Sequence, residues 1–507
     1  MRVPAATGVS RVAARLLGRL SPKLLMLSSV KSDQSEKDIK AGWSLRQTVA
    51  GLFVMVVCII GAIILKKNSA LCLIMNVLFW FCLGFLLTKD RGIRDNARYF
   101  IPLIPLYYLT FYFNRDVVEL WDKIFNSDTP RYLAEATNSV IQVRHMGFPV
   151  LIFPYSFLND VGLMLFNIPN LGREYLYIEI ALIGTIAVTV FSRLVSCYES
   201  SRTITILASY SLALSLAFWS LSSVIDTFVV STMLFMLFLL HVREYYETGS
   251  IERCISLALI TVIALALSLE NGYFVVLFGF ALTYNKLVEK RMSNWAHGVL
   301  YLGIVALGFV LMLKIAEITV GPNFYHTSGD RKFAMPATNL VENLYHYTSR
   351  FLDVKGGMSV SELLKGGFRI FVMSVSAQHG TPVDQYYIDS RMLLSVSSVG
   401  YISLSVAIIA MSVIGLIADG RREMRFLVSV ILLAQAIRFM FTAVYNRQDS
   451  TLFSTPSLAM FWLLIGFGLN SYLGGAKRLS GRLSGIFLAL VCGFLLVNNG
   501  WYLLGIK

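Results

Sequence analysis

Apolar runs long enough to cross a membrane recur along the chain of 507 residues, from residue 49 to residue 504. A transmembrane helix needs about 20 mostly apolar residues, because it rises about 1.5 Å per residue through a hydrocarbon core of about 30 Å. The whole chain is 56% hydrophobic and only 15% charged, and its mean hydropathy is +0.66. The sequence therefore predicts an all-α, polytopic transmembrane protein and excludes a soluble globular enzyme.

Thirteen of these runs are predicted to be spanning helices. The apolar segment 148–169 is not counted as a span, because it holds three prolines and because a fourteenth crossing would reverse the side of every later loop. We expect this segment to be re-entrant or interfacial on the outer side of the membrane. The predicted spans are residues 49–65, 71–88, 99–113, 175–191, 203–219, 224–240, 254–269, 272–284, 297–313, 393–417, 426–444, 453–469 and 485–504.

The positions of lysine and arginine predict the orientation of these helices. With the amino terminus in the cytoplasm, the six short cytoplasmic loops hold seventeen basic residues, against four in the short outer segments. Cytoplasmic loops of membrane proteins carry such an excess. The formal net charge of +14 therefore reports orientation, and nucleic acid is not a predicted partner.

The predicted topology places two long, comparatively polar segments outside the membrane, and catalytic or binding residues are expected there or in the short outer turns. The bacterial inner membrane is the expected location, with the active site on the outer face. The chain divides into a basic cytoplasmic segment (1–48), three spans (49–113), a first outer loop (114–174), spans four to nine (175–315), a second outer loop (316–391) and the last four spans (392–507).

Several carboxylates follow the third predicted helix, and a carboxylate at the boundary of membrane and water can act as a general base. Asp128 is the leading candidate, because Pro130 and Arg131 follow two and three residues later and predict the start of a helix. The same position also suits Asp128 to cap that helix, and the local pattern favours neither role over the other. The acids of this loop are Asp116, Glu119, Asp122, Asp128 and Glu135.

The string DTPRY at 128–132, followed by Arg144, His145 and Pro149, resembles the first-loop signature of the GT-C glycosyltransferases. This family includes the protein O-mannosyltransferases and the aminoarabinose transferase of lipid A. The resemblance extends to the topology, with a cytoplasmic start, an acidic first outer loop and a second large outer loop late in the chain. In this sequence Thr129 stands where the family has a second acid.

The resemblance implies an inverting transferase that moves one sugar from a polyprenyl-phosphate donor to an acceptor outside the cytoplasm. The acceptor would be lipopolysaccharide, O-antigen, another cell-envelope glycan, a lipid or a protein. Asp128 would be the catalytic base, and Arg131, Tyr132 and His145 would shape the donor pocket.

Two arginines are candidates to bind the donor. The departing lipid phosphate gains negative charge, which cations stabilise. Arg447 lies in a short outer turn, against the general charge trend, and Arg438 lies two to three turns earlier inside the eleventh predicted helix. An ion pair with Asp449 would also explain Arg447, and a buried pair between helices would also explain Arg438.

Two further acids lie at predicted outer helix ends, where the family has polar residues of the active cavity. They are Asp226, in the turn WSLSSVIDTF, and Glu270, in the turn LSLENGYF. For Asp226 the local pattern favours helix capping over a catalytic role. No metal-binding spacing occurs among the histidines of the second outer loop, so no cofactor is required, although a divalent metal is compatible with the reaction.

Two other functions fit parts of the same pattern. An O-antigen polymerase or ligase also combines many helices with a large outer loop, and its important cations would lie in residues 316–391. A transporter or flippase would use the intramembrane Arg438 and the outer acids as a substrate pathway. Transporters commonly have broken helices at matching places in two halves, and no such pair is found in the sequence.

Overall fold

The computed structural model describes eleven stretches of the chain, and all of them are helices, turns or short connections without any strand. The chain divides into two compact units, Met1–Ala50 and Gly51–Lys507. Of the first unit only residues 45–50 are described, as the beginning of a helix. The described residues are 45–118, 129–138, 141, 145–197, 201–287, 295–320, 371–372, 375–376, 396–445, 454–475 and 478–505.

A described helix lies at each of the thirteen places where the sequence predicts a span, beginning with Leu45–Ile64. In chain order, the helical elements that follow are α2 (Ser69–Lys89), α3 (Arg91–Ala97), α4 (Leu103–Val118), α5 (Thr129–Asn138), α6 (Pro149–Ile152), α7 (Pro154–Val161), the π-helix η2 (Gly162–Phe166), α8 (Leu171–Val195), α9 (Arg202–Ala213), α10 (Leu216–Leu221), α11 (Phe228–Thr248), α12 (Ile251–Leu267), the 3-10 helix η3 (Leu269–Gly272), α13 (Tyr273–Leu287), α14 (Trp295–Val320), α18 (Val396–Ala418), α19 (Arg422–Tyr445), α20 (Thr455–Gly475) and α21 (Arg478–Gly505).

Eight described helices are long and apolar enough to cross a membrane, so the protein is a helical, multi-pass membrane protein. Seven of these eight coincide with predicted spans, and the eighth is the segment Pro149–Phe166. The count of thirteen spans stays a prediction. It depends on shorter or more polar helices such as α4, α12 and α13.

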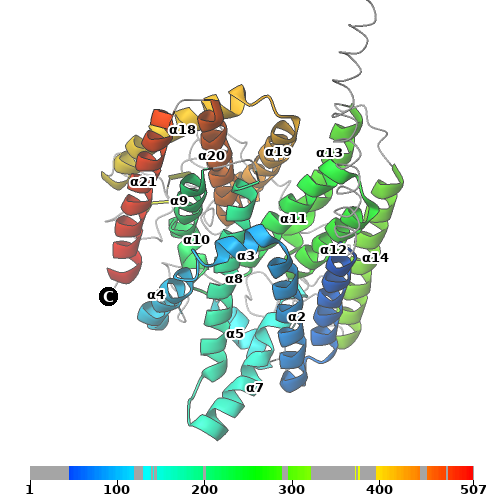
Figure 1. Ribbon diagram of the computed structural model, residues 1–507. Coiled ribbons are helices and arrows are strands. Elements are labelled where there is room, and N and C mark those ends of the chain that lie inside the picture. The colour runs from blue at the N-terminus through cyan, green and yellow to red at the C-terminus, as the bar shows by residue number, and fades with distance from the viewer. Residues whose placement is uncertain are drawn as a thin grey trace, which may run out of the picture. The chain divides into compact units, whose positions relative to one another are not determined.

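Helix α8 lies in the middle of the second unit and packs against α4, α7, α9 and α11 (Figure 1). Helices α11 to α14 pack together on one side of α8. On the other side α9 packs against α20 and α21, which both contact α18 (Figure 1). The contact between α4 and α8 includes an aromatic pair, since the rings of Phe111 and Tyr177 stack.

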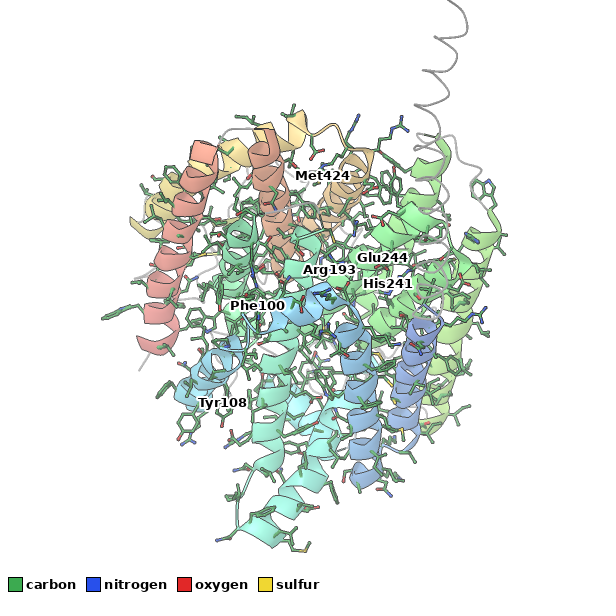
Figure 2. The ribbon with its side chains drawn as sticks, in the orientation of Figure 1. Phe100, Tyr108, Arg193, His241, Glu244 and Met424 are labelled. Carbon is green, nitrogen blue, oxygen red and sulfur yellow. The ribbon has the colours of Figure 1, made fainter. Side chains whose placement is uncertain are left out.

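Charged residues from three predicted cytoplasmic loops meet at one end of this bundle. Arg193 at the end of α8 pairs with Asp90 at 2.8 Å, and Arg253 near the start of α12 pairs with Glu244 of α11 at 2.7 Å. Figure 2 shows Arg193, His241 and Glu244 gathered there. We call this end, where α8 and α11 finish, the basic end, and the end where α11 begins and α12 finishes the site end.

The segment Pro149–Phe166 forms a helical hairpin with the start of α8. Gly172 lies so close to the carbonyl of Tyr155 that no side chain fits there. Val150, near the other end of the segment, accepts a hydrogen bond from Asn76 of α2, and Asn76 also contacts Glu179. Glu179 lies eight residues into α8, or about 12 Å from its start. The segment thus contacts the first part of α8, and its re-entrant placement stays a prediction, since it is also long and apolar enough to cross a membrane.

The predicted single helix at 203–219 is wrong at its centre, where the chain breaks between α9 and α10. The broken backbone groups find other partners. Asn499 of α21 donates to the carbonyls of both Leu214 and Val375 at 2.7 Å, and the amide of Leu216 donates to Val375 at 3.0 Å. A break inside a bundle is tolerated when such partners replace the helical hydrogen bonds.

Parts of the predicted second outer loop, residues 316–391, are helical or buried in the described structure. Helix α14 continues to Val320, and Val375 and Ser376 are completely buried among α9, α10 and α21. Similarly, α4 continues to Val118, so Asp116 belongs to this helix and not to the loop after it. Hydropathy alone placed the ends of these two helices too early, because each helix continues past its apolar stretch.

Candidate functional site

The described part of helix α5 starts at Thr129, the residue that follows Asp128 in the sequence. The Thr129 hydroxyl donates to the carbonyl of Ile225 at 3.1 Å, which fixes the start of α5 against the turn between α10 and α11. The neighbouring Asp226 is 2% exposed, and its carboxylate accepts a hydrogen bond from the amide of Thr227 at 2.6 Å. Asp128 itself lies outside the described residues.

Tyr132 and His145 are brought together beside the end of α12. Their rings meet edge to face with centroids 5.8 Å apart, and the ring of Phe148 lies 4.6 Å from that of Tyr132. His145 Nδ1 lies 3.0 Å from the carbonyl oxygen of Leu267. A carbonyl only accepts, so this contact places the proton on Nδ1. The contact satisfies a carbonyl at the helix end, where no intrahelical partner remains.

Gly147 brings the same segment even closer to α12. Its amide donates to the carbonyl of Ala266 at 2.7 Å, and a Cβ at this position would lie 2.9 Å from the Cβ of Ala266. Glycine is therefore required for the approach. His145 is fixed relative to α12 by two hydrogen bonds, one from its own ring and one from the backbone two residues on.

Arg131 pairs with Glu135 one turn later on α5, at 3.0 Å. Its guanidinium also lies 5.8 Å from the ring centroid of Tyr132. Glu135, one of the acids of the first outer loop, is only 6% exposed. The pair fixes Arg131 at the surface of α5, and Glu135 is already engaged with a cation.

The turn η3 presents Glu270 to Arg438. Asn271 holds this turn in place, because its side chain donates to the carbonyl of Ala264 at 2.9 Å and to the hydroxyl of Ser231 at 3.1 Å. Arg438 Nη1 lies 3.9 Å from Glu270 Oε2, and the two side chains are 3% and 10% exposed. The guanidinium also lies 5.8 Å from the ring centroid of Tyr273. A buried ion pair of this kind is costly to desolvate, and in a membrane protein it fits both a contact between packed helices and a position that meets a substrate.

The end of α12 links these two groups of predicted site residues. Leu267, its last residue, contacts His145, and Glu270 lies three residues later in the adjoining turn. The structure thus joins Tyr132 with His145 and Glu270 with Arg438, and places the start of α5 beside Asp226. Arg447, like Asp128, lies outside the described residues.

A polar network that the sequence analysis missed lies between α2 and α8. Glu179 Oε1 accepts hydrogen bonds from the side chains of Asn76, at 2.7 Å, and Trp80, while the hydroxyl of Tyr175 donates to the Asn76 carbonyl oxygen. Glu179 is 4% exposed, and within the described structure its Oε2 has no hydrogen-bond partner. The sequence does contain a sign of this network, because Glu179 is the single acid within the predicted apolar span 175–191.

This network supports the segment that carries His145. Asn76 donates to both Glu179 and the carbonyl of Val150, at 3.0 Å, and Val150 follows His145 by five residues. The network therefore connects α2 and α8 to the segment that reaches the end of α12. We assign it a positioning role.

No group of three metal-binding side chains converges within the described ranges. The chain matches no family model and no curated protein. The resemblance to GT-C glycosyltransferases stays an expectation based on the string at 128–132 and the topology. The functional case rests on the geometry of the site end.

Proposed function

We propose that the protein is an integral-membrane glycosyltransferase that transfers a sugar from a polyprenyl-phosphate donor to an acceptor at the site end of the bundle. The observation that carries the proposal is the buried pair of Arg438 and Glu270 at the same end as the helix that Asp128 precedes. Such a pair within an apolar bundle suits a polar substrate group that enters from the membrane interface. The proposed location is the bacterial inner membrane, with the site end outward.

In the proposed mechanism Asp128 acts as the base. It accepts the proton of an acceptor hydroxyl while that oxygen forms a bond to the anomeric carbon, and the bond from this carbon to the phosphate oxygen breaks with its electron pair leaving on the phosphate. Arg447 is the proposed partner of the departing phosphate.

The other described residues of the site orient these groups. Thr129 ties the start of α5 to the turn at Asp226, and His145 ties the following segment to the end of α12. In both contacts the partner is a backbone carbonyl, so the contacts fix the positions of the helices and turns relative to one another. The proposed proton transfer and phosphate binding belong to Asp128 and the arginines. Correct placement of reacting groups accounts for a large part of most enzymatic rate enhancements.

A transporter receives no added support from the break between α9 and α10. Broken helices in transporters expose backbone groups to bind the substrate or an ion. Here the carbonyl of Leu214 and the amide of Leu216 are both engaged with Asn499 and Val375. The backbone groups at the break therefore bind other residues of the protein.

The test is to supply the purified full-length protein, in lipid nanodiscs, with a panel of polyprenyl-phosphate hexoses and pentoses. We expect release of the lipid phosphate with at least one donor when a mixture of cell-envelope lipids and glycans is present as acceptor. Protein with the Asp128→Asn and Arg447→Ala substitutions serves as the inactive control. The absence of lipid-phosphate release with every donor would refute the proposed function.

A further inference from the structure

Two polar side chains beside the pair of Arg438 and Glu270 have no hydrogen-bond partner in the described structure. They are the hydroxyl of Tyr273 and the amide of Gln435, of which both the nitrogen and the oxygen are buried. Burying such groups without partners costs free energy, so native proteins rarely leave them unpaired. Three unpaired buried atoms next to one buried ion pair suit the binding of a polar ligand.

These groups come from three elements that meet at the site end. Gln435 lies three residues before Arg438 on α19, and therefore on the same face of the helix. Tyr273 is the first residue of α13, and its ring lies 5.8 Å from the guanidinium carbon of Arg438. Glu270 lies in the turn directly before α13. The polar cluster is thus built by Glu270, Tyr273, Gln435 and Arg438.

We propose that this cluster binds the uncharged sugar of the donor through its hydroxyl groups. A sugar hydroxyl both donates and accepts, and the cluster offers a carboxylate that accepts, a guanidinium that donates, and an amide and a phenol that do both. The inference deepens the proposed function and rests on it. It assigns Tyr273 and Gln435 as binding residues and the sugar as their ligand.

The charges of the cluster favour a neutral sugar over the phosphate. Arg438 is paired with Glu270, so the two formal charges cancel, and a phosphate would meet the carboxylate as well as the guanidinium. Taking a phosphate into such a neutral pair would add uncompensated negative charge.

Aromatic rings line the same place. The ring of Tyr273 lies 4.9 Å from that of Phe274, edge on, and 5.8 Å from that of Phe235. Ring faces beside polar groups are typical of sites where a ligand is fixed by a few placed hydrogen bonds among apolar contacts. A pyranose or furanose ring, with C–H groups on its faces and hydroxyls around its edge, has this combination of surfaces.

The test compares carriers with and without the sugar. Binding of bare polyprenyl phosphate and of polyprenyl-phosphate hexoses and pentoses is measured on the full-length protein in nanodiscs. The variants are Tyr273→Phe and Gln435→Leu, each of which removes hydrogen-bonding groups and keeps much of the side chain's volume. The matched control is Tyr401→Phe on α18, which also removes a hydroxyl from a buried tyrosine but lies outside the cluster.

We expect each variant to bind the preferred glycosylated carrier about tenfold more weakly, the usual effect of one hydrogen bond to a ligand, and to bind bare carrier normally. The control should bind both carriers as the wild type does. Equal weakening for both carriers, or no change for either, would overturn the sugar assignment while leaving the transferase proposal in place. A wild type that binds neither carrier would remove the proposed function itself.

Discussion

At the scale of single residues, Asp128 occupies the position directly before α5, where capping and catalysis make different demands on the side chain. Asparagine caps a helix about as well as aspartate, but it cannot accept a proton. We therefore expect Asp128→Asn to keep the melting temperature and to lower turnover by about a hundredfold to ten-thousandfold, as loss of a general base does.

Alanine at the same position separates the two roles further. Asp128→Ala should lose the same activity and, in addition, about 1 kcal/mol of stability from the missing cap. Thermal unfolding and sugar transfer, measured on the same preparations, check both expectations. Normal turnover in the asparagine variant would assign Asp128 to capping and move the search for the base to another acid, such as Asp226.

The pair of Arg438 and Glu270 gives a second prediction at this scale, because each residue is buried. Glu270→Leu leaves the guanidinium without its carboxylate, which typically costs about 3–5 kcal/mol for a buried pair. We expect the double variant Glu270→Leu with Arg438→Met to regain most of that loss, since neither charge remains. A double-mutant cycle on thermal stability measures the coupling, and additive losses would show that the pair does not interact in the folded protein.

At the scale of elements, the polar network between α2 and α8 is expected to stabilise their packing. Glu179→Leu would leave the Trp80 and Asn76 donors without an acceptor, at about 1–3 kcal/mol each. Glu179→Gln keeps one oxygen acceptor and should lose less. Thermal unfolding in one detergent compares both variants with Glu423→Leu, an exposed acid on α19. Equal stability of Glu179→Leu and wild type would exclude a structural role for the network.

The turn from α18 to α19 provides a pH-dependent prediction. Burial acts to raise the pKa of Asp419, but hydrogen bonds from Arg421, at 2.7 Å, and from Ser471 outweigh it and lower the pKa to about 2. A lowered pKa contributes stability that is complete above the unfolded-state pKa of about 3.9 and is lost as the pH falls toward 2.

We therefore expect the melting temperature of the wild type to fall between pH 4 and about pH 2 partly through Asp419. The variant Asp419→Asn should be less stable at neutral pH and should show a smaller fall in this window. Melting curves at a series of pH values test this, and parallel curves for the two proteins would contradict it.

At the scale of the whole molecule, the topology predicts that residues 128 and 379 face outside and that residues 94 and 421 face the cytoplasm. The contact of Asp90 with Arg193 places two of the predicted cytoplasmic loops at one end of the bundle, in agreement with the alternation of sides. All six native cysteines are free and would be replaced first. Single cysteines in intact cells should then react with an impermeant thiol reagent at 128 and 379 only. Labelling at 421 would invert the arrangement.

The sequence by itself determined the helical membrane class and the approximate places of the helices. These features depend on local composition, since an apolar run of sufficient length is stable in a bilayer only as a helix. Asp226, Glu270 and Arg438 could be named from sequence because a charge in or beside an apolar run is conspicuous.

Only the tertiary structure decided which of these residues meet. The pairing of Glu270 with Arg438 joins residues far apart in the sequence, as does the contact of His145 with Leu267. The break after α9 depends on Asn499, and the network at Glu179 depends on α2. Hydropathy does not record such partners, because each polar group is stabilised by a distant side chain or carbonyl, and their relative positions are set by how the helices pack.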